Sequence, residues 1–242
     1  IRFHLHELKA AETLLREALD LFSRLRRQLE TAETLVELAR LQIAGGLPER
    51  IGEGLDHLER AAAELAGLPV PLLAAWVKLE QSEALLRRGS YRQAAAAAGE
   101  VSDIFRRSDL RLRLAQALAV RADCWRFSQP DEARSLYDEA LALAGEGALL
   151  LAARCWHGLG RIHLDAGAPE AAEAALLNAV AVEETLRRTL RSHLHKAGFL
   201  AGKGSLHEEL LAAIQRQPQS EGRLLGQLER LKAGALVDLL QD

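Results

Sequence analysis

Two pairs of histidines raise the possibility of metal binding, because histidine is a common metal ligand. His4 and His6 stand two positions apart, as do His193 and His195. In a helix, residues two apart point about 200° away from each other, so neither pair can bind one ion. A zinc site also needs three or four converging ligands. The sequence therefore predicts no metal site.

Cys155 and His157 have the residue types of a nucleophile and its general base. They too are two positions apart, and Cys155 lies beside a tryptophan, so we expect a buried packing thiol. The stretch Gly202–Ser205 reads Gly-Lys-Gly-Ser but lacks the preceding strand and the spacing of a phosphate-binding loop. The sequence predicts no catalytic residues, no cofactor, and a chain that is not an enzyme.

The composition excludes further classes of protein. Hydrophobic residues make up 49% of the 242 residues and aromatic residues only 4%, which is typical of Ala- and Leu-rich helices in close contact. A net charge of -3 with interspersed signs argues against nucleic-acid binding. No apolar run reaches the roughly 18 residues of a membrane span. Two separated cysteines indicate reduced thiols, so we expect a cytoplasmic protein.

A repeated pattern of apolar residues runs through most of the chain. Each copy places small or bulky apolar residues at positions i, i+4 and i+7, which share one helix face and form a packing stripe. The second to fifth stripes start about 40 residues apart. A fixed period of that size predicts stacked helical hairpins, a scaffold that binds other molecules. The stripes are Ala11/Leu15/Ala18, Gly54/Leu58/Ala61, Ala94/Ala98/Val101, Ala133/Tyr137/Ala140, Ala172/Leu176/Ala179 and Leu224/Leu228/Leu231.

Glycine and proline divide this pattern into helices, because glycine ends a helix and proline cannot continue one. A break in the period after the fifth stripe predicts that its helix runs on toward Leu200. We expect an array over 1–187 and terminal helices over 188–242, in one continuous solenoid. The expected helices and hairpins cover about residues 4–28, 30–44, 49–66, 72–107, 110–145, 148–187, 205–216 and 221–240.

The fifth hairpin carries a motif of a known repeat family. Trp156-x-x-Leu159-Gly160-x-x-His163, followed by Gly167 and the stripe Ala172/Leu176/Ala179, resembles a tetratricopeptide repeat. Small residues at Gly160 and Ala172 let the two helices of one hairpin approach closely. The resemblance implies an all-α, right-handed α-solenoid of about five to six stacked TPR-like hairpins. The period exceeds that family's roughly 34 residues, so the repeats are divergent.

The C-terminal helix carries a narrower resemblance. Leu228–Leu240 is similar to the helix that joins the repeat array of bacterial CHAT proteins to a caspase-like protease domain. The segment from Leu190 to Leu206 resembles the irregular linker of the same proteins. This resemblance implies the sensing and regulatory region of a larger protease, whose peptidase domain would lie beyond Asp242. The chain's own C-terminal domain would then be one of its partners.

The TPR resemblance also implies a binding groove, lined by positions 2, 5 and 9 of each first helix. Such a groove suits a protein or peptide partner, either an amphipathic helix or an acidic segment. The alternative for Trp76 and Leu79 is that they are ordinary core between repeats. The implied groove residues are Trp76, Leu79 and Glu83 in the third hairpin, and Arg154, His157 and Arg161 in the fifth.

Two other functions remain open from the sequence. The apolar face of the last helix, which includes Leu224, Leu225 and Leu228, needs cover. The array could therefore act as a self-association module that forms a homo-oligomer. It could also be the TPR region of another multidomain signalling protein.

Overall fold

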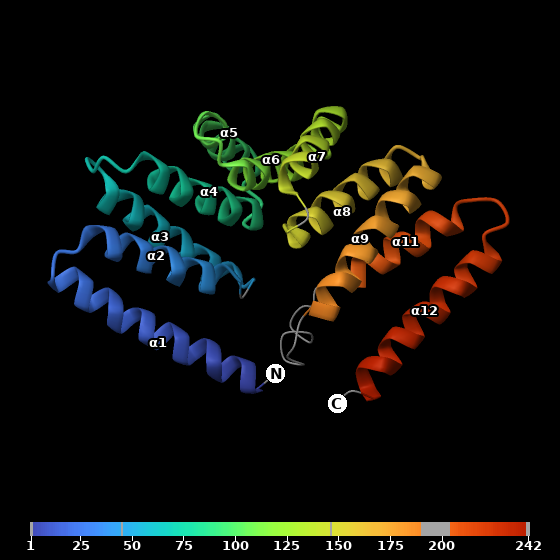
Figure 1. The fold of residues 1–242 in the computed structure, drawn as a ribbon, viewed down its shortest axis with the longest axis horizontal. Coiled ribbons are helices and arrows are strands. Elements are labelled where there is room, and N and C mark those ends of the chain that lie inside the picture. Colours follow the sequence, from blue (N-terminus) through green and yellow to red (C-terminus); the bar gives the residue numbers. More distant parts are fainter. Residues whose placement is uncertain (1, 45, 146, 190–203, 241–242) are drawn as a thin grey trace. The chain divides into compact units, whose positions relative to one another are not determined.

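The structure is a computed structural model that describes residues 2–44, 46–145, 147–189 and 204–240 (Figure 1). For 2–8, 187–189, 231 and 233–240 it describes the backbone only. Within the described residues the chain forms helices and no strand, which confirms the predicted all-α class. The helices are α1 (Arg2–Arg24), α2 (Gln28–Ala44), α3 (Pro48–Leu65), α4 (Pro71–Arg87), α5 (Tyr91–Arg107), α6 (Arg111–Trp125), α7 (Pro130–Ala144), α8 (Leu149–Asp165), α9 (Pro169–Thr189), α11 (Gly204–Gln215) and α12 (Glu221–Leu240).

The predicted helix boundaries agree with the structure within a few residues. Pro48, Pro71 and Pro130 lie in the first turns of α3, α4 and α7, where the missing N–H of proline costs nothing. The largest deviation is at the end of α1, predicted near residue 28 but found at Arg24. Arg26 there adopts a left-handed conformation with φ of 53°. No glycine or proline in that stretch announces the turn.

Glycines close two of the hairpins. Gly89 follows α4 with φ of 81°, and Gly167 follows α8 with φ of 70°. The N–H of Gly89 donates to the carbonyl of Leu86, and the N–H of Ser90 donates to the carbonyl of Leu85, each at 2.9 Å. These bonds satisfy the last carbonyl groups of the helix, in the arrangement that glycine best tolerates.

The chain divides into two compact units, Ile1–Trp125 and Arg126–Asp242. The boundary falls inside the predicted fourth hairpin, with α6 in unit 1 and α7 in unit 2. The predicted division between 187 and 188 rests on the repeat pattern, whereas these two units are defined by compactness. The predicted division therefore stays a prediction. Residues 190–203 lie outside the described residues, and with them the linker, His193, His195 and the predicted helix extension.

In unit 1, a glycine brings α2 and α3 together. A Cβ on Gly54 would lie 2.7 Å from Cγ1 of Ile43 and 3.2 Å from the carbonyl oxygen of Ala39. The first distance is too short for a methyl group and the second is unusually tight, so a larger residue here would force α2 and α3 to shift apart. The core around it comprises Ala32, Leu35, Val36, Ala39, Ile43, Ile51, Leu55, Leu58, Ala61, Leu65, Val77 and Ala84.

In unit 2, α8 carries two glycines at close contacts. A Cβ on Gly160 would lie 2.5 Å from Cγ of Leu176 in α9, and a Cβ on Gly158 would lie 2.3 Å from Cζ of Tyr137 in α7. The close approach predicted at Gly160 is therefore confirmed. Ala172, Leu176 and Ala179 form a core with Leu206, Leu210, Ala213 and Ile214 of α11.

The predicted stripes differ in burial along the chain. Those of α3, α5, α7 and α9 are fully buried, whereas Ala11, Leu15 and Ala18 of α1 are half-buried. In α12, Leu224 packs against the α9–α11 core. Leu228 is 41% exposed, and the side chain of Leu231 lies outside the described part of the chain. The first and last helices thus have fewer neighbours to cover their apolar faces.

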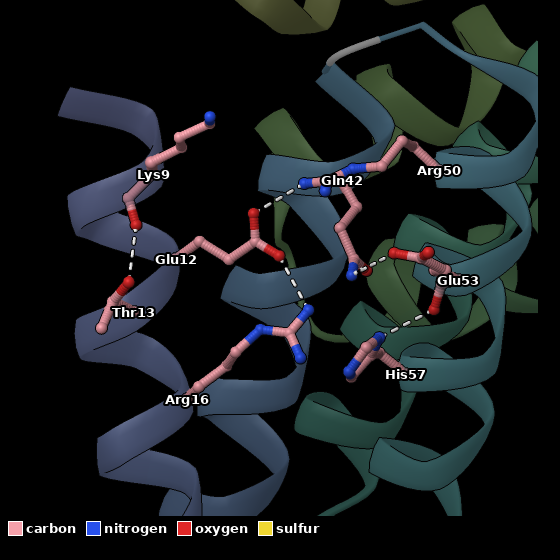
Figure 2. Close-up of polar contacts among 8 residues, drawn as sticks. All are labelled: Lys9, Glu12, Thr13, Arg16, Gln42, Arg50, Glu53 and His57. Atoms are coloured by element: carbon pink, nitrogen blue, oxygen red, sulfur yellow. Dashed lines mark hydrogen bonds and ion pairs between the residues drawn. The ribbon is translucent and has the colours of Figure 1, made fainter. Parts of the chain in front are cut away.

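Polar contacts join α1 to α3, and α2 to α3 (Figure 2). Glu12 accepts hydrogen bonds from Arg16 of its own helix and from Arg50 of α3, each at 2.8 Å. These bonds to Arg50 and Arg16 hold the pKa of the Glu12 carboxyl below its usual value. Beside them, Gln42 of α2 is fully buried and donates to Glu53 of α3 at 3.0 Å.

Candidate partner-binding surfaces

The first candidate surface lies in unit 1, where α4 contacts both α2 and α6. Trp76 of α4 is half-buried, and its Nε1 donates to Oε1 of Glu80 at 3.0 Å. The Arg113 guanidinium of α6 lies 5.4 Å from the centroid of the Trp76 ring, a cation–π contact. We call Arg40, Trp76, Glu80, Glu83 and Arg113 the Trp76 face.

Glu80 is the carboxylate at the centre of the Trp76 face. Only 16% of its side chain is exposed, and its nearest cation, Nε of Arg40 on α2, lies 3.8 Å away. Burial raises the pKa of Glu80, and the neighbouring Glu83 adds to the increase, while Arg40 and the Trp76 hydrogen bond oppose it. Because the pKa is raised overall, Arg40 and Trp76 only partly offset the loss of hydration of the Glu80 carboxylate. A cation from a partner would stabilise this carboxylate.

The three residues that the TPR register assigns to the groove in the third hairpin differ in burial. Trp76 and Glu83 are half-buried, so each presents part of its side chain to solvent. Leu79 is 2% exposed and belongs to the core, which is the alternative that the sequence leaves open for it. Register alone does not distinguish these positions, because burial depends on the neighbouring helices α2 and α6.

The second candidate surface lies in unit 2, where α8 contacts α11. Nε2 of His157 lies 2.7 Å from Oε2 of Glu209, and Nε of Arg161 lies 3.4 Å from Oε1 of the same carboxylate. Arg154 is half-buried. The predicted basic positions therefore meet an internal acid. No sequence pattern points to Glu209, since it lies 52 residues from His157.

A polar network also ties α12 to α9. Nε2 of Gln217, a residue only 7% exposed, donates to Oε2 of Glu173 at 2.7 Å. Arg223 of α12 donates to the same Glu173 oxygen at 2.8 Å and to Oε1 of Gln217 at 2.9 Å. This network fixes the start of the last helix, and no local sequence pattern predicts it.

The residues that suggested chemistry form no reactive arrangement in the described part of the chain. Cys155 is fully buried and forms no disulfide, as expected of a packing thiol. His163 is half-buried, and burial lowers its pKa; Arg134 adds to the decrease and Asp138 opposes it. No group of three metal-ligating side chains occurs among the described residues. None of the described helices is both long and apolar enough to span a bilayer.

Comparisons with known proteins identify the fold. No protein-family model and no curated protein matches the chain. The crystal structure of BtubC (BKLC) from P. vanneervenii is similar, with a TM-score of 0.71 and 16% identity over 94% of this chain and 92% of that one. TPR-like repeats of a kinesin light chain from Podosopora anserina have a TM-score of 0.55 and 22% identity over 88% and 97%.

A third similar structure is the apo form of the quorum sensor NprR from B. thuringiensis. It has a TM-score of 0.57 and 14% identity over 93% of this chain and 66% of the NprR chain. NprR in complex with its cognate peptide NprX is also similar, with a TM-score of 0.53. At these identities the likeness concerns the fold alone. The chain thus has the all-α solenoid fold of TPR-like helical repeat proteins.

Proposed function

We propose that this chain is a non-catalytic scaffold that binds a protein or peptide. The observation that carries the proposal is the Trp76 face, where an amphipathic aromatic ring stands among partly exposed charges of three helices. Tryptophan and arginine are the residues that most often dominate binding energy at protein interfaces. NprR, which has a similar fold, forms a complex with a peptide, and this supports a peptide-binding role here.

The two candidate surfaces favour different parts of a partner. An amphipathic helix fits the Trp76 face, with its apolar side on the Trp76 ring and a basic residue beside Glu80. An acidic segment fits Arg154, His157 and Arg161 of α8. Because Glu209 lies against His157 and Arg161, an acidic partner must compete with that carboxylate.

Selection from a random peptide library on the immobilised chain tests this proposal. We expect the selected peptides to bind at least about ten-fold more weakly to Trp76→Ala or to Arg161→Glu, measured by fluorescence anisotropy. Arg60→Glu on α3, an exposed position that belongs to neither surface, should leave the affinity unchanged. A selection without specific binders, or affinities equal in all variants, would contradict the scaffold role.

A finer part of the proposal is that the chain is the sensing region of a CHAT-type protease in the bacterial cytoplasm. The support is the resemblance of Leu228–Leu240 to the helix before that protease domain. Binding of a partner would then shift α12 through the Gln217–Glu173–Arg223 network. The reading frame beyond Asp242 tests it: a histidine and a cysteine on an α/β pattern support a peptidase, and a stop codon removes this part.

Self-association is the second candidate function. It is favoured by the exposed apolar residues Leu225 and Leu228 of α12, which are 60% and 41% exposed. Light scattering across a concentration series distinguishes the two ideas. A mass that rises with concentration in the native chain, but not in Leu225→Glu, supports self-association. A constant monomer mass would exclude self-association and favour the scaffold role.

A further inference from the structure

Unit 1 contains a polar pocket at the turn between α1 and α2. Its volume is about 420 Å³, and its walls come from the end of α1, the turn, the start of α2 and the end of α3. The lining residues are Ser23, Arg26, Gln28, Thr31 and Glu64. None of these five side chains has a hydrogen bond or ion pair with another described residue. A pocket of this size can hold a small ligand.

Thr31 is the buried member of this set, with only 3% of its surface exposed. The other threonines whose side chains the structure describes bond the carbonyl four residues earlier: Thr13 at 2.9 Å, Thr34 at 2.7 Å and Thr185 at 3.0 Å. The hydroxyl of Thr31 makes no such bond, although it lies in the same kind of helix. Although the residue is buried, its hydroxyl is open to the pocket, where it is available to a ligand.

Arg26 stands in a turn whose geometry favours glycine. Its N–H donates to the carbonyl of Ser23 at 3.1 Å, and the next N–H donates five residues back, to Phe22, at 3.0 Å. Gly89 and Gly167 occupy the equivalent positions of two other turns, also with positive φ. An arginine there holds the backbone in a conformation that strains every residue with a Cβ. The chain nevertheless has an arginine at this position, and its side chain lines the pocket.

The pocket presents charges of both signs. Arg26 supplies a cation and Glu64 an anion, and their charged groups are more than 4 Å apart, since they form no ion pair with each other or with another described residue. The pocket also lies beside Gln28, the first residue of α2, where the positive end of the helix dipole favours an anion. Arg26 is exposed and Glu64 is half-buried, so a ligand with one charge would pair with one of them and leave the other to solvent, whereas a zwitterion pairs with both.

We propose that this pocket binds a small zwitterion, a free α-amino acid. Its carboxylate lies between the Arg26 guanidinium and the start of α2, and its ammonium group meets Glu64. The hydroxyls of Ser23 and Thr31 and the amide of Gln28 bond the remaining polar atoms. The site is separate from the Trp76 face, so it adds a small-molecule input to the proposed scaffold without depending on it.

Titration of the purified chain with each of the twenty L-amino acids, one at a time, tests the proposal by isothermal calorimetry. We expect saturable binding of at least one of them with a dissociation constant of about 1 mM or tighter, in keeping with the small size of the ligand. The amide of the best ligand lacks the carboxylate, and its N-acetyl form lacks the ammonium. Each should bind at least about ten-fold more weakly.

Three variants locate the binding. Arg26→Gly relieves the backbone strain and removes the cation, so it should raise the melting temperature and weaken binding at least about ten-fold. Thr31→Val keeps the shape of the side chain and should weaken binding several-fold. In Glu64→Gln, the ligand and its N-acetyl form should bind with the same affinity, because the carboxylate that meets the ammonium group is gone. Arg60→Gln on the same helix as Glu64 is the matched control and should bind like the native chain.

The proposal fails if none of the twenty amino acids binds saturably. It also fails if the amide and the N-acetyl form bind as well as the parent ligand, or if Arg26→Gly and Thr31→Val both retain native affinity. The rise in melting temperature of Arg26→Gly shows independently that the variant is folded. Loss of peptide binding at the Trp76 face leaves this result unaffected.

Discussion

Single glycines decide how closely the helices of one hairpin approach. Gly54 and Gly160 each lie where a methyl group would overlap a residue of the paired helix, Ile43 and Leu176 respectively. The sequence indicates the small residue at both positions through the stripe and the TPR motif. How short the contact is follows only from the packed helices.

Replacement of Gly54 by alanine should destabilise unit 1. The added Cβ meets Ile43 and the backbone oxygen of Ala39, and backbone cannot move aside without separating α2 from α3. We expect a loss of about 1–3 kcal/mol in the free energy of unfolding, measured by urea denaturation. Gly52→Ala on the same helix meets no atom within 4 Å and should gain about 0.5–1 kcal/mol. Equal effects of the two variants would contradict the close approach.

Glu80 should make stability depend on pH. Because its folded pKa is raised, its contribution is fully present below the unfolded pKa of about 4.3. That contribution is lost as pH rises through the folded value. Glu80→Gln keeps the acceptor for Trp76 Nε1 and carries no charge, so it should be relatively more stable at neutral pH than at pH about 4. Urea midpoints at both pH values measure this, and parallel profiles for variant and native chain would rule it out.

At the scale of helices, polar bonds supplement apolar packing where a helix has few neighbours. α1 is the example, because its stripe is only half-buried while Glu12 joins it to Arg50 of α3.

The turns between helices are a second local feature. Asp109 and Gln219 have positive φ without being glycine, at 52° and 54°.

Glu12→Gln should loosen α1 without unfolding the rest of unit 1. The lowered pKa of Glu12 means that its contribution is present above the unfolded pKa and is lost as pH falls through the folded value. At neutral pH we expect α1 to lose about 1 kcal/mol of protection in hydrogen exchange. Glu17→Gln, an exposed position on the same helix, is the control. Unchanged exchange in α1 would show that the Glu12 bonds contribute nothing.

Asp109→Gly should stabilise the turn between α5 and α6. The N–H of Asp109 donates to Arg106, and the N–H of Leu110 donates to Phe105, the same pattern that Gly89 adopts after α4. Glycine relieves the left-handed strain of the aspartate, so we expect a gain of about 0.5–1 kcal/mol in thermal unfolding. Asp109→Ala, which keeps a Cβ, should show no gain. A loss in the glycine variant would mean that the Asp109 side chain stabilises the turn.

At the scale of the whole molecule, the chain consists of two compact units that divide after Trp125. Each has a buried apolar core of its own, one among α2, α3 and α4 and the other between α9 and α11. In repeat proteins stability is close to a sum of local terms, because each repeat contacts mainly its neighbours.

Fragments 1–125 and 126–242 should therefore each fold alone. We expect both to show the circular dichroism of a helical protein and a cooperative thermal transition. Fragments cut after residue 110 serve as the comparison, since they separate α6 from α5, with which it packs. If either fragment of the first pair lacks helical structure, its core does not suffice by itself.

The sequence by itself determined the helices, most of their boundaries and the buried stripes. These features depend on local rules: a helix repeats every 3.6 residues, glycine and proline end it, and an apolar face must be covered. The turn at Arg26 was missed because an arginine there carries no turn signal. The resemblance to TPR repeats gave the solenoid class, since the Trp156 motif encodes the packing of one hairpin.

The tertiary structure alone decided which polar groups meet. Glu209 pairs with His157 and Arg161 across 52 residues of chain, Leu79 joins the core, and the walls of the polar pocket come from three helices. Such contacts arise from the relative placement of packed helices, and one charged residue on a helix surface resembles another in sequence. The physical reason is that burial and pairing are properties of neighbours in space, which a local period does not specify.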